Sequence, residues 1–273
     1  MADETDRGAF IWYELMTPDP GGAKAFYDAV VGWDVQSDGQ AMPNGSEYRM
    51  IGRSDGGNAG GVLTLTEAMQ AGGARPGWIG YICHPDVDGA AKTVTDAGGT
   101  VHMPPMDMPG VGRMAMVADP WGATFYVMDP VPPEGDSNAK SDVHDPDRAQ
   151  HMRWHDVWTG EDSDAAAALY ADLFGWRTEG GMPMGDGREY RFLTRSDRAF
   201  GGMAPALTDG PGPRMAFYIG VDDIDRAVAA VKDGGGELFG EPQSVPGGDY
   251  SVHIRDPQGA SVGLVGPREE QPA

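Results

Sequence analysis

The stretch "DPWGATFYV" (119–127) returns near the end of the chain as "DPQGASVGL" (256–264). In each copy, the Asp-Pro pair and the glycine that follows it favour a tight turn. The residues after that glycine are small, β-branched, aromatic or aliphatic, which is typical of a strand. A turn followed by a strand is therefore present twice, and this predicts a duplicated fold.

Two other pairs of stretches support the duplication. "FYDAVVGW" (26–33) returns as "LYADLFGW" (169–176), and "EYRMIGRSD" (47–55) returns as "EYRFLTRSD" (189–197). The pairs occur in the same order in both halves of the chain, as expected for an internal repeat. We therefore expect two tandem copies of one folding unit.

The segment between the copies, "PVPPEGDSNAKSDVHDPDRAQ" (130–150), is rich in Pro, Asp and Ser and poor in apolar residues. Such a composition is typical of a linker. We predict a first domain at residues 1–132, a linker at 133–150 and a second domain at 151–273.

Each half contains two segments whose apolar residues recur at helical spacing. A strand-like run precedes each segment, and about three strand-like runs follow it. The order strand, helix and three strands therefore occurs four times. This predicts an α+β fold of two tandem domains, each a pair of βαβββ motifs that form a curved eight-stranded sheet, with helices outside and a cup inside. The four predicted helical segments are 23–30, 87–94, 166–173 and 224–231.

Composition excludes several classes of partner. The chain of 273 residues has 42 acidic and 20 basic residues, so its net charge of -22 disfavours nucleic acid and anionic membrane surfaces. No apolar run approaches the ~20 residues that span a bilayer. The single cysteine, Cys83, indicates a reducing compartment. We expect a cytoplasmic protein, a monomer or a homodimer, whose partner is a small molecule.

The order of these motifs resembles the vicinal oxygen chelate superfamily, which includes glyoxalase I, bleomycin-resistance proteins, extradiol dioxygenases and fosfomycin-resistance enzymes. The resemblance rests on the two "DPxGA" turns and on four helical stretches. It implies a tandem-domain, glyoxalase-like protein. The helical stretches are "AFYDAVVGW" (25–33), "AAKTVTDAGGTV" (90–101), "LYADLFGW" (169–176) and "AVAAVKDGGGEL" (227–238).

Metal-binding members of this family carry one ligand on the first strand and one on the last strand of each motif. His, Gln or Glu is usual at these positions. A single histidine binds a divalent metal too weakly to hold it. We therefore predict no metal and no cofactor. Matching the motifs places the first-strand positions at Trp12, Trp78, His155 and Ala216. The last-strand positions, counted from the "DPxG" turns, are Tyr126 and Gly263, and the corresponding places in the other two motifs fall near Thr64 and Pro205.

Large amphipathic side chains at former ligand positions suit a ligand cavity, although core filling is the alternative. Glu14 and Met16 follow Trp12 on the same strand face, because side chains alternate along a strand. Glu14 and His155 are also candidate catalytic residues, although a hydrogen-bonded structural role is the favoured interpretation of His155. The predicted ligand-binding residues are Trp12, Glu14, Met16, Trp78, Tyr126 and His155.

The leading hypothesis is a protein that binds a small, mainly aromatic or apolar molecule in a cup without a metal. Glu14 would favour a cationic guest, and the aromatic residues would favour the first domain. The methionine-rich stretch 102–116 is better explained as an adaptable apolar wall than as a copper site. The alternative is an enzyme: a metal-dependent lyase, an extradiol-type dioxygenase, or a metal-free acid/base catalyst using Glu14 or His155. Whether a reaction is catalysed stays open.

Overall fold

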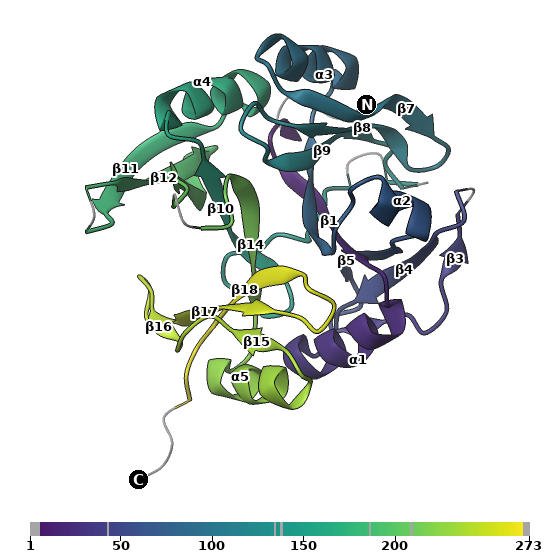
Figure 1. The fold of residues 1–273 in the computed structure, drawn as a ribbon, viewed down its shortest axis with the longest axis vertical. Coiled ribbons are helices and arrows are strands. Elements are labelled where there is room, and N and C mark those ends of the chain that lie inside the picture. Colours follow the sequence, from purple (N-terminus) through teal and green to yellow (C-terminus); the bar gives the residue numbers. More distant parts are fainter. Residues whose placement is uncertain are drawn as a thin grey trace. The chain divides into compact units, whose positions relative to one another are not determined.

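The computed structural model describes residues 6–42, 44–133, 135–136, 139–185, 187–207 and 210–269 (Figure 1). Parts of the predicted linker, residues 134, 137 and 138, lie outside this set. Across the described ranges, the strands form two sheets, one from each half of the chain. This confirms the α+β fold and the tandem repeat.

The first sheet has nine strands: eight follow the order β2-β4-β5-β1-β6-β9-β8-β7, and the two-residue strand β3 pairs with β4. The first half contains β1 (Phe10–Thr17), α1 (Pro20–Val31), β2 (Asp34–Val35), β3 (Gln40–Ala41), β4 (Glu47–Gly52), β5 (Asn58–Thr64), α2 (Glu67–Ala71), β6 (Gly77–Cys83), α3 (Val87–Asp96), β7 (Thr100–Met108), β8 (Gly112–Ala118) and β9 (Thr124–Pro130). Helix α2 was not expected from the sequence.

The second sheet repeats this order as β11-β12-β13-β10-β14-β18-β17-β15, and β16 lies beside β17. The second half contains β10 (Met152–Thr159), α4 (Ser163–Phe174), β11 (Arg177–Pro183), β12 (Glu189–Arg195), β13 (Arg198–Pro205), β14 (Arg214–Gly220), α5 (Ile224–Asp233), β15 (Glu237–Leu238), β16 (Gln243–Ser244), β17 (Tyr250–Arg255) and β18 (Ser261–Gly266). All four predicted helices are therefore present.

Local sequence sets the ends of the helices. An aspartate begins each of the four longer helices, and its carboxylate accepts a backbone N–H of the first turn. Helices α1 and α4 end at Gly32 and Gly175, which have φ values of 80° and 67°. Glycine adopts this left-handed conformation without steric cost, so the "GW" of both repeats marks a helix end. The capping aspartates are Asp19, Asp86, Asp162 and Asp223.

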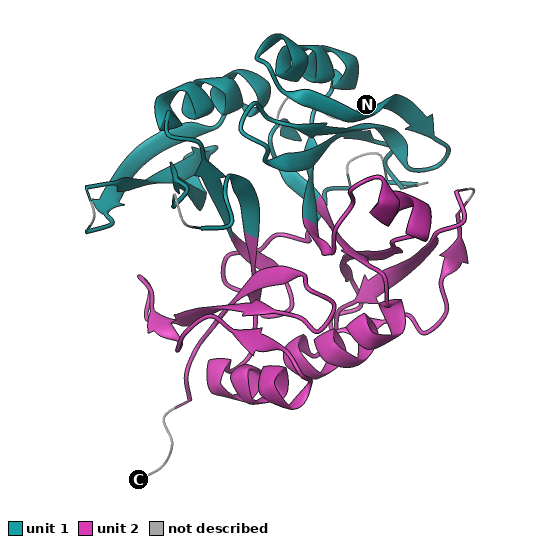
Figure 2. Cartoon of the chain, in the orientation of Figure 1, with its two compact units in different colours: residues 1–11, 79–141, 155–216 teal, residues 12–78, 142–154, 217–273 magenta. Residues whose placement is uncertain are grey.

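The chain divides into two compact units (Figure 2). Unit 1 contains residues 1–11, 79–141 and 155–216, and unit 2 contains residues 12–78, 142–154 and 217–273. Each unit therefore combines one βαβββ motif from the first half with one from the second. The predicted domain boundaries follow the sequence halves instead, and they stay a prediction.

In unit 2, the repeated tyrosine and aspartate motifs meet in the buried core. The Tyr27 hydroxyl of α1 donates to Asp256 Oδ2 at 3.0 Å, and it accepts the Trp78 indole N–H at 3.0 Å. Asp256 Oδ1 accepts the backbone N–H groups of Gln258 and Ala260 and so holds its own turn. One aspartate of "DPQG" therefore fixes both a turn and a helix.

Unit 1 contains the matching arrangement. The Tyr170 hydroxyl of α4 donates to Asp119 Oδ2 at 2.7 Å. Asp119 Oδ1 accepts the backbone N–H groups of Trp121, Gly122 and Ala123. Burial raises the pKa of the Tyr170 hydroxyl well above 10, as it does for the tyrosine in unit 2. Each bond therefore joins a neutral hydroxyl to a buried carboxyl group.

Candidate functional site

In unit 1, one face of the first sheet packs against helix α4, and we call this the covered face. The Phe125 ring of β9 packs against the rings of Tyr170 and Phe174 on this helix. Side chains alternate along a strand, so Tyr126 lies on the opposite face. We call the sheet faces that are turned away from the helices the open faces.

The open face of unit 1 in the first sheet is lined by two tyrosines and five methionines. The rings of Tyr81 and Tyr126 stack with centroids 4.1 Å apart and an angle of 10° between their planes. Tyr126 pairs across the strands with Met116, and Met116 pairs with Met103, so these side chains form a row. The next row on the same face runs from Met128 through Met114 to Met106, of which Met106 is 43% exposed. We call these seven residues the Met-Tyr face.

In unit 2, the open face of the first sheet carries Trp12, Glu14 and Met16. The Trp12 indole N–H donates to the Tyr48 hydroxyl at 2.7 Å. Glu14 is 2% exposed and pairs with Gly61, where a Cβ atom would collide with the Tyr48 hydroxyl. Tyr48 therefore lies across the strand beside a buried carboxyl group. We call Trp12, Glu14, Met16 and Tyr48 the Trp-Glu face.

The second sheet has the same arrangement of a tyrosine, a glycine and an acidic residue in unit 1. The Tyr190 hydroxyl donates to Asp156 Oδ1 at 2.5 Å, and Asp156 pairs with Gly202. A Cβ atom at Gly202 would collide with the Tyr190 ring. Trp158 follows Asp156 on the same open face, and the Arg214 guanidinium lies 5.6 Å from its ring centroid. We call Asp156, Trp158, Tyr190 and Arg214 the Asp-Trp face.

In unit 2, the open face of the second sheet has a smaller aromatic pair. The Tyr218 hydroxyl lies 2.9 Å from His253 Nε2. Both residues pair with Gly263, where a Cβ atom would collide with the Tyr218 ring. The glycine at this position of "DPQGASVGL" thus makes room for a tyrosine from the neighbouring strand. In "DPWGATFYV" the corresponding residue, Tyr126, stacks on its neighbour instead.

The structure brings together three of the predicted site residues and places the others elsewhere. Trp12, Glu14 and Met16 share one open face, and Tyr126 lies on the Met-Tyr face. Trp78 packs against Tyr27 and Trp33 and so lies between the sheet and α1.

His155 is buried in unit 1 among aromatic side chains. Its ring stacks on Phe10 with centroids 4.1 Å apart, and Nδ1 lies 2.8 Å from the Phe200 carbonyl oxygen. These surroundings are those of a hydrogen-bonded structural histidine, which is the interpretation that the sequence favours. The neighbouring residue, Asp156, points to the open face.

The motif match that places a ligand position at His155 is one residue out in β10. Strands β1 and β10 have the same pattern of burial, which pairs Trp12 with Trp154 and Glu14 with Asp156. The pairing of both acidic residues with glycine in the neighbouring strand gives the same correspondence. Sequence reasoning therefore missed Asp156, although "WYEL" (12–15) and "WHDV" (154–157) share an aromatic-aromatic-acidic-aliphatic order.

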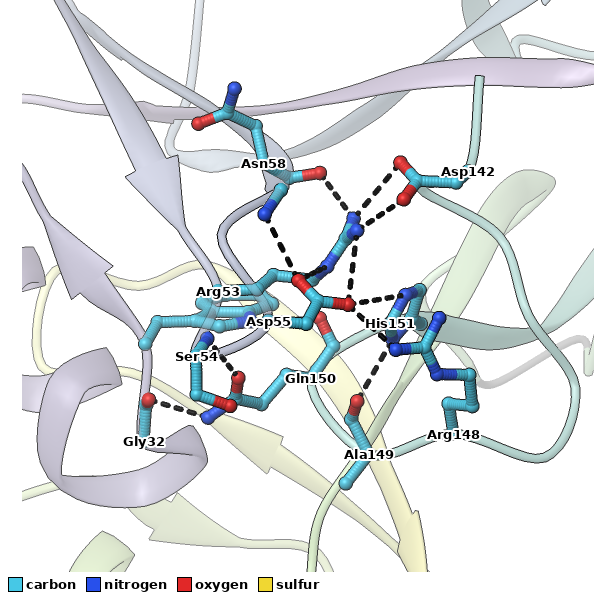
Figure 3. Close-up of polar contacts among 12 residues, drawn as sticks. Gly32, Arg53, Ser54, Asp55, Asn58, Asp142, Arg148, Ala149, Gln150 and His151 are labelled. Atoms are coloured by element: carbon cyan, nitrogen blue, oxygen red, sulfur yellow. Dashed lines mark hydrogen bonds and ion pairs between the residues drawn. The ribbon is translucent and has the colours of Figure 1, made fainter. Parts of the chain in front are cut away.

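A separate polar cluster in unit 2 joins the β4–β5 turn to the segment before β10 (Figure 3). Arg53 Nη2 lies 2.5 Å from Asp142 Oδ2, and Arg148 Nη2 lies 2.7 Å from Asp55 Oδ2. The buried His151 ring points toward Asp55, with Nε2 3.8 Å from Oδ2. A pocket of about 470 Å³ lies beside this cluster.

The cluster does not fit a metal ion. Among the described residues, Asp55, Asp142 and His151 are the one group of three whose ligand atoms lie within 4.8 Å of one another. The guanidinium groups of Arg53 and Arg148 already neutralise its two carboxylates. A backbone N–H from Gly57, with Arg53, lowers the pKa of Asp55 from 3.8 to about 2. A divalent cation would have to displace a buried guanidinium.

The open faces do not fit a metal ion either. At the centre of each face, a residue on the first strand of a βαβββ motif pairs with a residue on the last strand of the same motif. The last-strand residue is glycine or tyrosine. Each pair supplies at most one carboxylate, whereas metal sites use three or four protein ligands. The four pairs are Glu14 with Gly61, Tyr81 with Tyr126, Asp156 with Gly202 and Tyr218 with Gly263.

The sequence matches the family described as the Glyoxalase/Bleomycin resistance protein/Dioxygenase superfamily over residues 9–127 and 155–264. The chain belongs to this superfamily. It is 28% identical over 268 residues to CFP32 of Mycobacterium tuberculosis, covering 98% of both chains. It is also 29% identical to the anthracycline biosynthesis protein DnrV of Streptomyces peucetius, covering 97% of this chain and 96% of DnrV.

Solved structures share the fold at low sequence identity. The Mn(II)-bound glyoxalase of Novosphingobium aromaticivorans superposes with a TM-score of 0.61 at 18% identity, covering 97% of this chain and 84% of that one. The 2,2',3-trihydroxybiphenyl 1,2-dioxygenase of Sphingomonas wittichii gives a TM-score of 0.63 at 14% identity, covering 95% and 90%. Within the described part of the chain, every helix is too short or too polar to cross a membrane.

Proposed function

We propose that the protein binds a small, mainly aromatic or apolar organic molecule on the open side of its first sheet, without a metal. The Met-Tyr face of unit 1 carries this proposal. The stacked tyrosines are each 7% exposed, so they would form the floor of the site, while the flexible thioethers around them would adapt to the shape of a guest. Each Å² of apolar surface removed from water contributes roughly 25 cal/mol.

Taken by itself, the Trp-Glu face of unit 2 supports the binding of cationic guests. Glu14 is buried on the face that also carries Met16 and the hydrogen-bonded pair of Trp12 and Tyr48. A carboxylate in such surroundings attracts a cation more strongly than one in water does. Relatives named as anthracycline biosynthesis proteins point to a similar guest, because anthracyclines are planar polycyclic aromatics that carry an amino sugar.

The sequence predicts that a ligand prefers the first domain, and fewer residues now support this prediction. Trp12 corresponds to Trp154, and Trp78 lies on the covered face. The remaining contrast is between Tyr126, stacked on Tyr81, and Gly263 beneath Tyr218. We retain the preference on that contrast alone.

Calorimetric titration with three planar probes tests the proposal. The probes are cationic daunorubicin, neutral 1,4-dihydroxyanthraquinone and anionic anthraquinone-2-sulfonate. We expect Tyr126→Ala to weaken binding of the neutral probe at least tenfold, and Tyr126→Phe to preserve it. Met182→Ala, on the other sheet, serves as the control. Glu14→Gln should reduce the advantage of daunorubicin over the neutral probe.

The same preparation provides the metal test. Elemental analysis should find far less than one transition metal per chain, and EDTA should leave binding unchanged. Binding that is abolished by EDTA, or that is unaffected by Tyr126→Ala, would contradict the proposal.

A further inference from the structure

We propose that the pocket beside the polar cluster of unit 2 is a second binding site, for an uncharged polyhydroxylated molecule such as a monosaccharide. None of the residues that line this pocket belongs to an open face. The inference therefore does not depend on the function proposed for the first sheet.

The pocket has the size of a small-molecule site. Its volume of about 470 Å³ falls within the roughly 300–1,000 Å³ that is usual for ligand pockets. Its walls are the end of α1, the β4–β5 turn, the segment before β10, and the first turn of α5 with the loop before it. All these walls belong to unit 2.

Gln150, in the segment before β10, ties this segment to two other walls (Figure 3). Its Nε2 donates to the Gly32 carbonyl at the end of α1, and its Oε1 accepts the Ser54 N–H of the turn. Gln150 has a φ of 64°, a left-handed backbone conformation that residues with a side chain seldom adopt. Such conformations persist where the surrounding contacts hold them, and they are concentrated at functional sites.

The internal repeat shows that the fold does not require polar residues at this place. In unit 1 the corresponding residues are Gly8 and Ala9, since the Gly8 carbonyl accepts the indole N–H of Trp176 as the Gln150 carbonyl accepts that of Trp33. The φ of Gly8 is 79°, which glycine adopts without strain. Unit 2 therefore has glutamine and histidine where the same fold elsewhere uses the two smallest residues.

His151 brings an unused acceptor to the pocket. Its ring is buried, and Nδ1 lies 2.9 Å from the Ala149 carbonyl oxygen, which can only accept, so Nδ1 carries a hydrogen. In the neutral ring Nε2 is then an acceptor, and the described residues provide no donor for it. The nearby Asp55 Oδ2, at 3.8 Å, is itself an acceptor. Buried polar atoms without partners are rare in folded proteins, and a donor on a guest would supply the partner.

Arg148 brings donors to the same place. Its side chain is 52% exposed, and its Nη2 donates to Asp55 Oδ2 at 2.7 Å. The His151 ring points toward the same oxygen, so the imidazole acceptor and the guanidinium donors lie side by side (Figure 3). Arg148 contacts Asp55 through one nitrogen, so its side chain can turn without losing the pair and would then open Nε2 to the pocket.

This combination of groups selects a hydroxyl. A hydroxyl group both donates and accepts, so it can donate to the His151 imidazole and accept from the Arg148 guanidinium. An ammonium group has no acceptor for the guanidinium, and a carboxylate has no hydrogen for the imidazole.

The charge balance of the pocket also favours an uncharged guest. Each carboxylate and each guanidinium that lines it already has an ion-pair partner. A charged guest would therefore compete with an existing pair, whereas an uncharged guest leaves the pairs intact. The pairs are Lys24 with Asp28, Arg148 with Asp55, and Arg226 with Asp222.

Nuclear magnetic resonance of the full-length protein with ¹⁵N-labelled histidine, at mildly alkaline pH, tests the inference. The probes are three pyranoses of similar size: glucose, the cationic glucosamine and the anionic glucuronate. We expect glucose to move the His151 Nε2 signal upfield, as a new hydrogen bond to an unprotonated ring nitrogen would. The two charged pyranoses should bind roughly tenfold more weakly, which corresponds to about 1.4 kcal/mol.

Substitutions that copy unit 1 separate binding from folding. His151→Ala introduces the residue that unit 1 has at this place, so the variant should melt as a folded protein but no longer bind glucose in calorimetric titration. Gln150→Gly copies the neighbouring position and should weaken glucose binding without loss of stability. Arg148→Met should weaken it roughly tenfold. Asp197→Asn, in the corresponding turn of unit 1, is the matched control and should have no effect.

Three results would overturn the inference. One is that glucose leaves the His151 signal unmoved at millimolar concentration, which would assign the unused acceptor to bound water. Another is that a charged pyranose binds as tightly as glucose. The third is that a folded His151→Ala protein binds glucose as tightly as the unmodified chain. None of these results would bear on the Met-Tyr face, which is tested by different probes and by Tyr126 variants.

Discussion

Asp119 and Asp256 explain why the chain contains the same turn twice. One carboxylate oxygen of each aspartate holds the backbone of its own turn, and the other accepts a tyrosine hydroxyl from a helix of the opposite half. Burial raises the pKa of Asp256, so its surroundings disfavour the ionised form. The tyrosine hydroxyl is a donor that helps this carboxyl group to remain buried.

Replacing Tyr27 by phenylalanine should therefore destabilise the protein. The change removes the hydroxyl that donates to Asp256 and leaves the buried carboxyl group with one donor fewer. We expect the free energy of unfolding to fall by about 1–3 kcal/mol. Denaturation in urea measures this change, and Tyr250→Phe, at a half-buried site, is the matched control. Equal stability of both variants would show that the bond contributes nothing.

At the scale of elements, the register of the strands decides which side chains reach an open face. The helices and most strands could be predicted from the periodicity of apolar residues and from the glycines that end the helices. A small error of alignment does not change either signal. The faces could not be predicted as well, because a shift of one residue moves a side chain to the other side of the sheet. That shift exchanged His155 for Asp156. Trp78 was placed on the wrong side for the same reason.

The polar cluster around Asp55 links two elements, the β4–β5 turn and the segment before β10. The pKa of Asp55 is lowered to about 2, mainly by the backbone N–H of Gly57. Its contribution to stability is therefore complete above the ordinary pKa of 3.8 and is lost as pH falls toward 2.

Asp55→Asn should remove this part of the pH dependence. We expect the melting temperature of the unmodified protein to fall more steeply than that of the variant between about pH 4 and pH 2. Calorimetric melts across this range measure the difference. Asp38→Asn, at an exposed position, should keep the steep fall. Parallel curves for the Asp55 variant and the unmodified chain would refute the assignment.

At the scale of the whole molecule, the sequence halves and the compact units differ. The sequence alone predicts that each half folds by itself, since each has two complete motifs. Each compact unit nevertheless draws one motif from each half. Contacts between the halves, such as the bond from the Tyr27 hydroxyl to Asp256, could not be read from spacing.

We therefore expect the separated halves, cut within the linker, to melt without cooperativity. Mixing them should restore a single cooperative transition, because the buried tyrosine and aspartate partners are then reunited. Calorimetry of each half and of the mixture measures this directly. Two isolated halves that each melt cooperatively would instead support the sequence-based boundaries.

The reciprocal tyrosine–aspartate bonds also bear on ancestry. A half-length ancestor would have carried one such tyrosine and one such aspartate, and the present geometry satisfies each with a partner from the other repeat. Two identical short chains related by a twofold axis would meet both requirements at once. Gene duplication and fusion would then have converted a homodimer into one polypeptide. The two copies were thereafter free to diverge, and the difference between Met16 and Trp158 is one outcome.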